Sequence, residues 1–265
     1  MGIVGAGNVG TAICVLFAPP LAQAYGWTTV YGLAALAVLA PMLVMIIFAK
    51  EPDDLDEHAT FRQHIACLFE KDGWAFSLIY IITFGGFIGL SSFLVTYYYD
   101  QFGVSKVQAG QLAMLAAFMG AALRVFGGWI SDRFGGVNTL NVVILTVAAS
   151  LVLCSFSTGS LVATTLLIML CFAALGAGNG ALFQLVPLRW PLTTAVAGSM
   201  IGEIGALGGS LVPNAMGLAK QHTGTYAWGF VFFAVLAILV FFMLRKMQLR
   251  WTRTWAEKGG RARTA

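Results

Sequence analysis

The sequence predicts an all-helical protein that crosses a membrane several times. Of its 265 residues, 59% are hydrophobic and only 10% are charged, and the mean hydropathy is +0.84. A soluble domain carries about 25% charged residues. Apolar stretches recur at about the 20-residue length that spans a bilayer as a helix. Because backbone polar groups in lipid must be satisfied within their own segment, each stretch is expected to be helical.

Eight stretches have the length and composition of transmembrane helices. In chain order they are 2–20, 28–49, 74–99, 106–130, 138–157, 161–187, 194–219 and 225–249. Five tryptophans fall near the ends of these stretches, where an aromatic belt meets the lipid headgroups: Trp27, Trp74, Trp129, Trp190 and Trp228.

One long polar connection, 50–73, separates two helices before it from six after it. Its first part, EPDDLDEH, is acidic. In its second part, FRQHIACLFEKD, one helical face carries Phe61, Ile65, Leu68 and Phe69. This pattern favours a short helix that lies on the membrane surface.

Basic residues are divided unequally between the two sets of loops. One set, together with the end of the last span and the tail 250–265, holds twelve of them: Lys50, Arg62, Lys71, Arg133, Arg189, Arg245, Lys246, Arg250, Arg253, Lys258, Arg261 and Arg263. The opposite set holds Lys106 and Lys220. Because Lys and Arg accumulate on the cytoplasmic side, both termini are expected in the cytoplasm and the tail is interpreted as a topology determinant.

The chain opens on a glycine-rich segment, GIVGAGNVGTAICVLFAPP. Gly5, Gly7 and Gly10 have the spacing of a dinucleotide-binding loop, which also needs a preceding strand and an acidic residue about 20 residues later. Only residues 1–4 precede Gly5, and the first carboxylate is Glu51. Glycines at helical spacing instead favour close packing between membrane helices.

Away from the span ends, two charged residues fall inside predicted spans, where a charge costs about 3 kcal/mol or more and usually serves a function. Arg124 lies about two turns before a loop, so its side chain could snorkel to the surface. We favour a place in a central cavity, because small residues surround Arg124 and no carboxylate neighbours it on its own helix. An unpaired guanidinium matches a planar oxyanion in two-point contact.

The second ionisable residue, Glu203, lies in GSMIGEIGALGGSLVP. It could pair with Arg124, carry a coupled proton, or stand protonated against a neighbouring backbone, and the sequence favours none of the three. The same segment has a second edge of small residues, formed by Gly202, Gly205, Gly208 and Gly209.

Tyr80 and Phe84 share one helical face, one turn apart. Such a pair usually reflects ordinary packing. It can also form an aromatic wall that holds a flat ligand and offers one hydroxyl. The chain shows no haem, flavin or metal-ligand pattern. We therefore expect no cofactor, no metal, no enzymatic activity and no nucleic-acid partner, with the lipid bilayer as surroundings.

The segment GGWISDRFGG, residues 127–136, resembles the cytoplasmic loop motif of the major facilitator superfamily. In that family the motif joins the second and third helices of a six-helix half. The resemblance implies that 74–99 is the seventh helix of a twelve-helix transporter. It also implies a role in conformational change for Gly128, Asp132, Arg133 and Gly135. Gly136 and Val137 stand where the family has basic residues.

Three further stretches resemble the nitrate/nitrite porter branch of that superfamily: GAGNVGTAICVLFAPPLA (5–22), GAGNGALFQLVP (176–187) and GEIGALGGSLVPNAMG (202–217). The resemblance implies that Arg124 is the substrate arginine and that Tyr80 and Phe84 line the anion site. It matches Gly7, Asn8, Gly10, Gly205 and Gly209 with signature residues on helices that flank this site. Glu203 has no match and remains a candidate for coupling.

The resemblance implies a transporter of nitrate, nitrite or both in the inner membrane. It makes 1–49 the last two helices of an N-terminal half, 50–73 the linker between halves and 74–249 a complete C-terminal half. Four helices of such a transporter would precede Gly2 and carry a second substrate arginine. We therefore expect a truncated chain. The alternatives are a porter for another small anion, or a non-transporting fragment that pairs with a separate N-terminal half.

Overall fold

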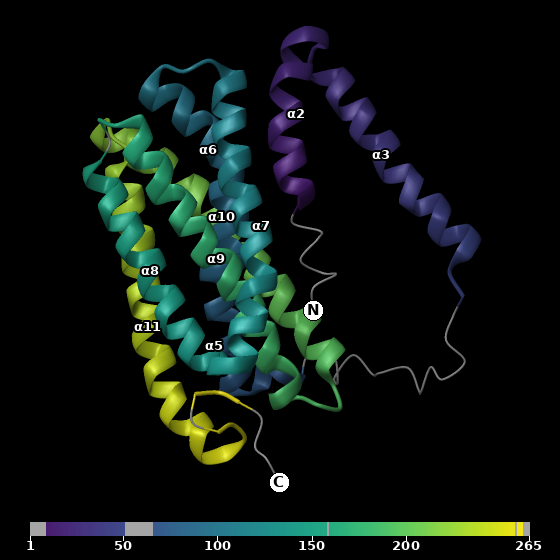
Figure 1. The fold of residues 1–265 in the computed structure, drawn as a ribbon, viewed down its shortest axis with the longest axis vertical. Coiled ribbons are helices and arrows are strands. Elements are labelled where there is room, and N and C mark those ends of the chain that lie inside the picture. Colours follow the sequence, from purple (N-terminus) through teal and green to yellow (C-terminus); the bar gives the residue numbers. More distant parts are fainter. Residues whose placement is uncertain (1–8, 51–65, 158, 258, 262–265) are drawn as a thin grey trace.

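The computed structural model describes residues 9–50, 66–157, 159–257 and 259–261. Every regular element within these residues is helical (Figure 1). In chain order the elements are α2 (Val9–Tyr25), α3 (Trp27–Phe48), the 3₁₀-helix η1 (Ala66–Phe69), α5 (Lys71–Tyr80), the π-helical turn η2 (Ile81–Gly85), α6 (Gly86–Phe102), α7 (Lys106–Phe134), α8 (Gly136–Phe156), α9 (Leu161–Arg189), α10 (Thr194–Thr223) and α11 (Ala227–Thr254).

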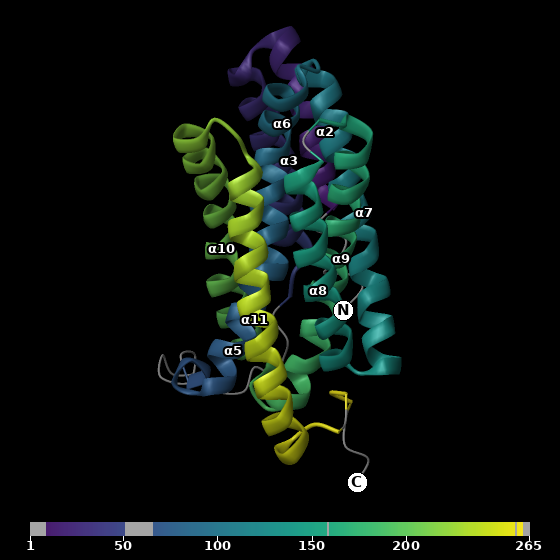
Figure 2. The same ribbon diagram turned by 90° about the vertical axis from the view of Figure 1, so that its left-hand side faces the viewer.

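Seven helices of the described chain are long and apolar enough to cross a membrane. One of them, Lys71–Phe102, combines α5, η2 and α6, and the shorter α2 has 17 residues. The predicted all-helical membrane fold is therefore confirmed. The helices from α5 to α11 run along one long axis in both views (Figures 1 and 2).

Glycines bring α7 and α9 into backbone contact. A side-chain carbon added at Gly127 would overlap Ala177, and one added at Gly180 would overlap the carbonyl oxygen of Arg124. A carbon added at Gly176 would overlap the carbonyl oxygen of Gly120. In lipid, where no hydrophobic force drives helices together, such close approach provides the packing energy.

The π-helical turn lies where α10 crosses the first long span. A carbon added at Gly85 would lie 2.6 Å from the Cα of Gly208, so the two backbones touch there. Gly205 of α10 faces the ring of Tyr80, and an added carbon at Gly209 would lie 2.9 Å from Ile88. Gly205, Gly208 and Gly209 therefore pack α10 against the span that carries Tyr80 and Phe84, whereas an added carbon at Gly202 would meet nothing within 4 Å.

The N-terminal pair of helices sits beside this bundle. Helix α2 packs on α7, where Gly110 meets the carbonyl oxygen of Val15, and none of the residues of α3 is buried. An added carbon at Gly10 would meet nothing within 4 Å. The close packing expected at Gly10 is therefore not present among the described residues, whereas Gly110 supplies it on the partner helix.

The expected surface helix in the linker falls partly outside the described residues, including Phe61 and Ile65. The described part is the short 3₁₀-helix Ala66–Phe69, in which Phe69 is 80% exposed. Helix α5 then begins at Lys71, inside the range expected to be linker.

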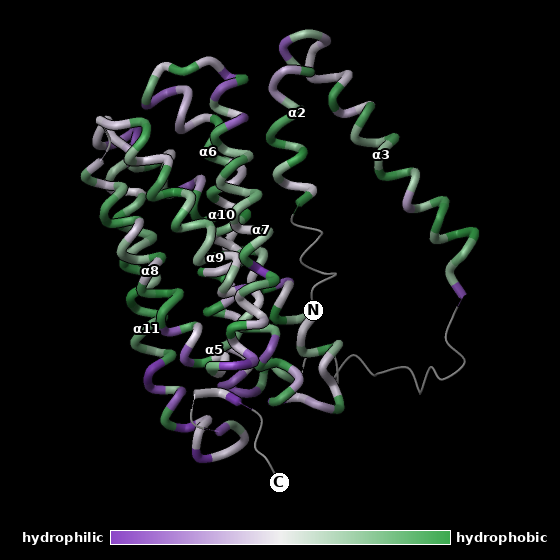
Figure 3. Tube along the Cα trace, viewed as in Figure 1, coloured by the Kyte–Doolittle hydropathy of each residue, from purple (hydrophilic) through white to green (hydrophobic). Residues whose placement is uncertain are grey.

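A polar cluster explains this early start. The buried carboxylate of Asp72 accepts hydrogen bonds from Arg189 Nε at 2.6 Å and from Trp251 Nε1 at 3.0 Å. Arg189 also pairs with Glu70, and Arg250 lies 3.8 Å from Asp72. These contacts tie together α5, α9 and α11 at the hydrophilic end of the bundle, which we call the basic end (Figure 3).

Trp190, at the same end, is 7% exposed, whereas Trp27, Trp74, Trp129 and Trp228 are more than half exposed. Its ring packs edge-on against Phe76, with centroids 5.2 Å apart. Its assignment to an aromatic belt was therefore wrong, because Phe76 and the chain around it enclose the indole.

At the opposite end, the Tyr226 hydroxyl donates a hydrogen bond to Asp100 Oδ2 at 2.8 Å. Burial and the neighbouring Asp100 carboxylate raise the pKa of Tyr226 to about 12. The hydroxyl therefore keeps its proton near neutral pH and joins the end of α6 to the start of α11.

Candidate functional site

Arg124 lies in the interior of the bundle, on α7. Its side chain does not snorkel, because the residue is only 7% exposed. The close contact between α7 and Gly180 of α9 fixes the backbone at this position. Among the described residues, every carboxylate–guanidinium pair lies at the basic end, and none includes Arg124. A buried guanidinium without a counter-ion is costly, so this one calls for an anionic ligand.

A group of three aromatic rings lies beside the guanidinium of Arg124, two of them within cation–π range of it. Tyr80 and Phe84 stack with centroids 4.7 Å apart and ring planes 10° apart. Arg124 Cζ lies 5.9 Å from the centroid of Phe84 and 6.0 Å from that of Phe183, within cation–π range. Phe183 meets Tyr80 edge-on, with ring centroids 5.2 Å apart. The structure thus brings together the three residues that the sequence pointed to.

A π-helical turn, Ile81–Gly85, begins directly after Tyr80. A π-turn adds a residue to the helical repeat and changes the direction of the side chains after it. Such turns are often found at functional sites. Here Phe84 is part of the turn itself, so the turn sets how the two rings face Arg124.

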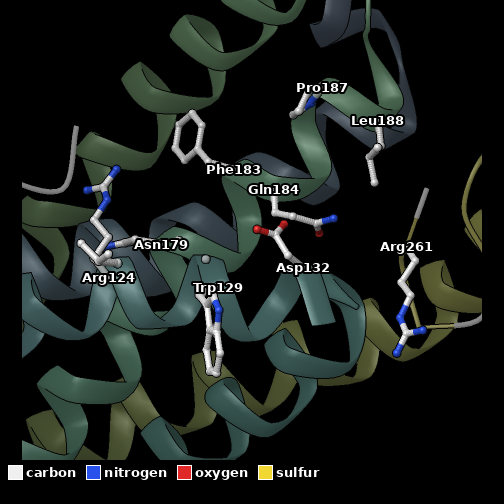
Figure 4. A pocket seen from close by; sticks show the side chains of 12 residues that line it. Arg124, Trp129, Asp132, Asn179, Phe183, Gln184, Pro187, Leu188 and Arg261 are labelled. Atoms are coloured by element: carbon white, nitrogen blue, oxygen red, sulfur yellow. The ribbon is translucent and has the colours of Figure 1, made fainter. Parts of the chain in front are cut away.

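A cavity of about 620 Å³ opens beside Arg124, between α7 and α9 (Figure 4). Three charged side chains line it: Arg124, Asp132 and Arg261. Arg124 and Arg261 stand on opposite sides of it in Figure 4, with Asp132 between them. Two guanidinium groups and one carboxylate leave a net positive charge in this cavity.

Asn179 of α9 also lines the cavity, and Figure 4 shows its amide directed toward the base of the Arg124 side chain. Asn179 is fully buried, and neither its Nδ2 nor its Oδ1 has a hydrogen-bond partner within the described chain. The Oε1 of Gln184, five residues further along α9, is likewise unpartnered there. Buried amides without partners cost free energy, so they are suited to a polar ligand or water.

The sequence did not single out Asn179 or Phe183. The signal for Asn179 was an asparagine enclosed by glycines in an apolar helix, within GAGNGALFQLVP. Phe183 follows one turn later, so the same helical face carries both residues.

The loop motif at the end of α7 lies at the wall of the cavity. Gly128 and Asp132 line it, and an added carbon at Gly128 would meet nothing within 4 Å. Arg133 stacks on Trp129, with Cζ 4.2 Å from the ring centroid. Gly135 ends the helix with φ 90°, a left-handed value that favours glycine.

Other expected site residues lie elsewhere. Glu203 is exposed on α10, and within the described chain it makes no ion pair with Arg124. Gly205 and Gly209 pack α10 against the first long span, with Gly205 directly behind Tyr80. Gly7 and Asn8 lie outside the described residues. The described chain also contains no group of His, Cys, Asp and Glu side chains that could hold a metal ion.

The described chain thus combines seven helices that are long and apolar enough to cross a membrane with a charged cavity between α7 and α9. The sequence model of the Major Facilitator Superfamily matches residues 1–213, and the chain belongs to this family. A solved structure of the fucose:proton symporter FucP from E. coli has the same fold, with a TM-score of 0.64 and 18% identity over 86% of this chain and 58% of that one.

Curated relatives point to a branch of the family. The chain is 29% identical to the nitrite extrusion protein of Bacillus subtilis over 252 residues, which cover 92% of the chain and 61% of the relative. It is 28% identical to the probable nitrate/nitrite antiporter NarK1 of Thermus thermophilus, covering 94% and 63%. It is 29% identical to the probable nitrate transporter NarT of Staphylococcus haemolyticus, covering 91% and 62%. The chain thus spans about three-fifths of the length of these relatives.

Proposed function

We propose that this chain forms the anion-binding part of a transporter that carries nitrate, nitrite or both across a cell membrane. The observation that supports this most is the buried Arg124 guanidinium, which has an aromatic surround, an adjacent cavity and no carboxylate partner among the described residues. The names of the curated relatives support the choice of substrate.

A small planar oxyanion suits this arrangement. The guanidinium presents a flat fork of donors that can make two parallel hydrogen bonds to two oxygens of one anion. The Tyr80–Phe84 stack, close to that fork, offers a flat surface for a flat ligand. The Asn179 amide lies nearby and provides donors for a remaining oxygen. Transport then requires that this site be exposed to each side of the membrane in turn.

Alternating access in this superfamily comes from the rocking of two halves around a site at the midplane. In our proposal, α5–α11 form one half, α2 and α3 belong to the other, and the remainder of that other half pairs with them. The chain lies in the inner membrane with its termini and basic end in the cytoplasm, because Lys and Arg accumulate there.

The test joins the chain to an N-terminal segment of the Bacillus subtilis relative, long enough to supply the four further helices of the proposed fold. We call this fusion the complemented transporter. Reconstituted in vesicles, it is expected to take up labelled nitrate in a saturable way, with nitrite competing better than sulfate or phosphate. Equal competition by these larger anions would favour a porter of another specificity, and no saturable anion uptake at all would contradict the proposal.

The 265-residue chain alone is expected to show no nitrate or nitrite uptake above empty vesicles. The described Arg124 site is built from α5, η2, α7 and α9, and an anion held at a single wall is not sealed from either side. Saturable uptake by the chain alone, abolished by Arg124→Ala, would show that two copies supply each other's missing wall.

A further inference from the structure

The segment after α11 is folded back as a compact turn. Its backbone is closed by two hydrogen bonds, from Glu257 N to Arg261 O at 3.0 Å and from Gly260 N to Glu257 O at 2.9 Å. Ala256, Gly259 and Gly260 are buried. The last residues that the structure describes are therefore packed against the bundle. We call Ala256, Glu257 and Gly259–Arg261 the C-terminal turn.

The C-terminal turn docks on the first turn of α8. The carbonyl oxygen of Gly259 accepts hydrogen bonds from the backbone N–H groups of Val137 at 3.0 Å and Asn138 at 3.2 Å. These groups have no partner inside α8, because the first N–H groups of a helix have no preceding carbonyl. The turn therefore caps α8 immediately after the loop motif.

Glycine is required at the points of contact. Gly259 has φ 96°, and a carbon added there would lie 2.6 Å from Asn138 Nδ2. A carbon added at Gly135, on the other side, would overlap the Gly259 carbonyl. Such a fit between two glycines specifies one docked position for the turn, which a simple basic tail would not need.

This docking places Arg261 in the lining of the Arg124 cavity (Figure 4). Arg261 stands across the cavity from Arg124 and, within the described chain, forms no ion pair. Without Arg261, the charges of Arg124 and Asp132 would cancel. With Arg261, the cavity carries one net positive charge, and the added charge lies on the side of the cavity away from Arg124.

We propose that Arg261 is a second anion-binding residue, which draws small oxyanions into the cavity that leads to Arg124. The C-terminal turn holds it there. A positive side chain at the rim of a cleft raises the local concentration of anions and the rate at which they enter. The identity of the ligand class rests on the proposed function, whereas the electrostatic role of Arg261 does not.

The test measures how charged reagents reach the cavity, independently of transport. A reporter cysteine is placed in the cavity wall by Gln184→Cys, in a Cys14→Ser chain, since Cys14 is the exposed cysteine among the four. The purified chain in nanodiscs is reacted with methanethiosulfonates of similar size, one anionic and one cationic. The readout is the ratio of the anionic to the cationic reaction rate.

Arg261→Gln is expected to lower this ratio by roughly three- to tenfold, and Arg261→Lys to preserve it. Gly259→Ala, which keeps Arg261 but disturbs the docked turn, should lower the ratio as well. The matched control is Arg253→Gln, which removes an exposed charge from the end of α11 outside the cavity and should leave the ratio unchanged.

An unchanged ratio in Arg261→Gln would overturn the proposal, and so would an equal drop in Arg253→Gln, because the tail would then act through its overall charge. The difference between parent and Arg261→Gln should shrink in 1 M salt, where screening acts over about 3 Å. Loss of nitrate uptake by the complemented transporter with an unchanged labelling ratio would contradict this role of Arg261 but not the proposed function.

Discussion

A side-chain carbon added at Gly180 would overlap the backbone carbonyl oxygen of Arg124, so α9 and α7 touch backbone to backbone at the anion site. Gly180→Ala is therefore expected to destabilise the protein by about 1–3 kcal/mol, because overpacking must separate the two helices. Thermal unfolding in detergent measures this loss. The matched control is Gly128→Ala, where an added carbon has room and should leave the melting temperature equal or slightly higher. Equal melting temperatures for the two variants would show that the helices do not pack as described.

A substitution at Asn179 can distinguish a ligand-binding role of this residue from a purely structural one. Replacing a buried, unpartnered amide by an apolar side chain of similar size removes a desolvation cost. Asn179→Leu should therefore leave the melting temperature unchanged or raise it, while it weakens nitrate binding to the complemented transporter. Calorimetric titration of nitrate and thermal unfolding, on the same sample, test both halves of this expectation. A lower melting temperature with intact binding would assign Asn179 to the structure alone.

In the polar cluster at the basic end, Asp72 should make the largest contribution to the free energy of unfolding. Asp72→Ala leaves Arg189 and the Trp251 N–H without their buried acceptor. Loss of one partner of such a pair costs about 3 kcal/mol or more. Glu70→Gln, at a carboxylate that is 39% exposed, serves as the control and should cost less than about 1 kcal/mol. Similar losses of stability in the two variants would show that the burial of Asp72 does not increase its contribution.

The proposed orientation is tested by cysteine accessibility. A cysteine at Lys106 or Lys220 should react with a membrane-impermeant thiol reagent added outside intact cells, and one at Arg133 should react only after the membrane is opened. Arg133 is exposed in the last turn of α7, so burial would not explain its protection. The reversed pattern would place the basic end outside the cell.

The helical spans were predictable because their apolar length is a local property of the sequence. The group of side chains around Arg124 was predictable only in part. Tyr80, Phe84 and Arg124 carried local or family signals, but Phe183 and Asn179 reach Arg124 only because Gly127 and Gly180 let α9 approach α7. The π-turn lies at a contact between Gly85 and Gly208, which are far apart in the chain. The docking of Gly259 on α8 and the burial of Trp190 against Phe76 are tertiary contacts of the same kind.

The central claim is that the Arg124 guanidinium binds the transported anion through its planar fork. Its most direct test is nitrate affinity, measured by calorimetry on the complemented transporter with Arg124→Lys, which keeps the charge but loses the fork. The variant should bind nitrate about 10- to 100-fold more weakly and unfold at the same temperature as the parent, while Arg245→Lys, at an exposed position on α11, should bind as the parent does. Unchanged nitrate affinity in a stable Arg124→Lys protein would contradict the account and leave Arg124 with a structural role.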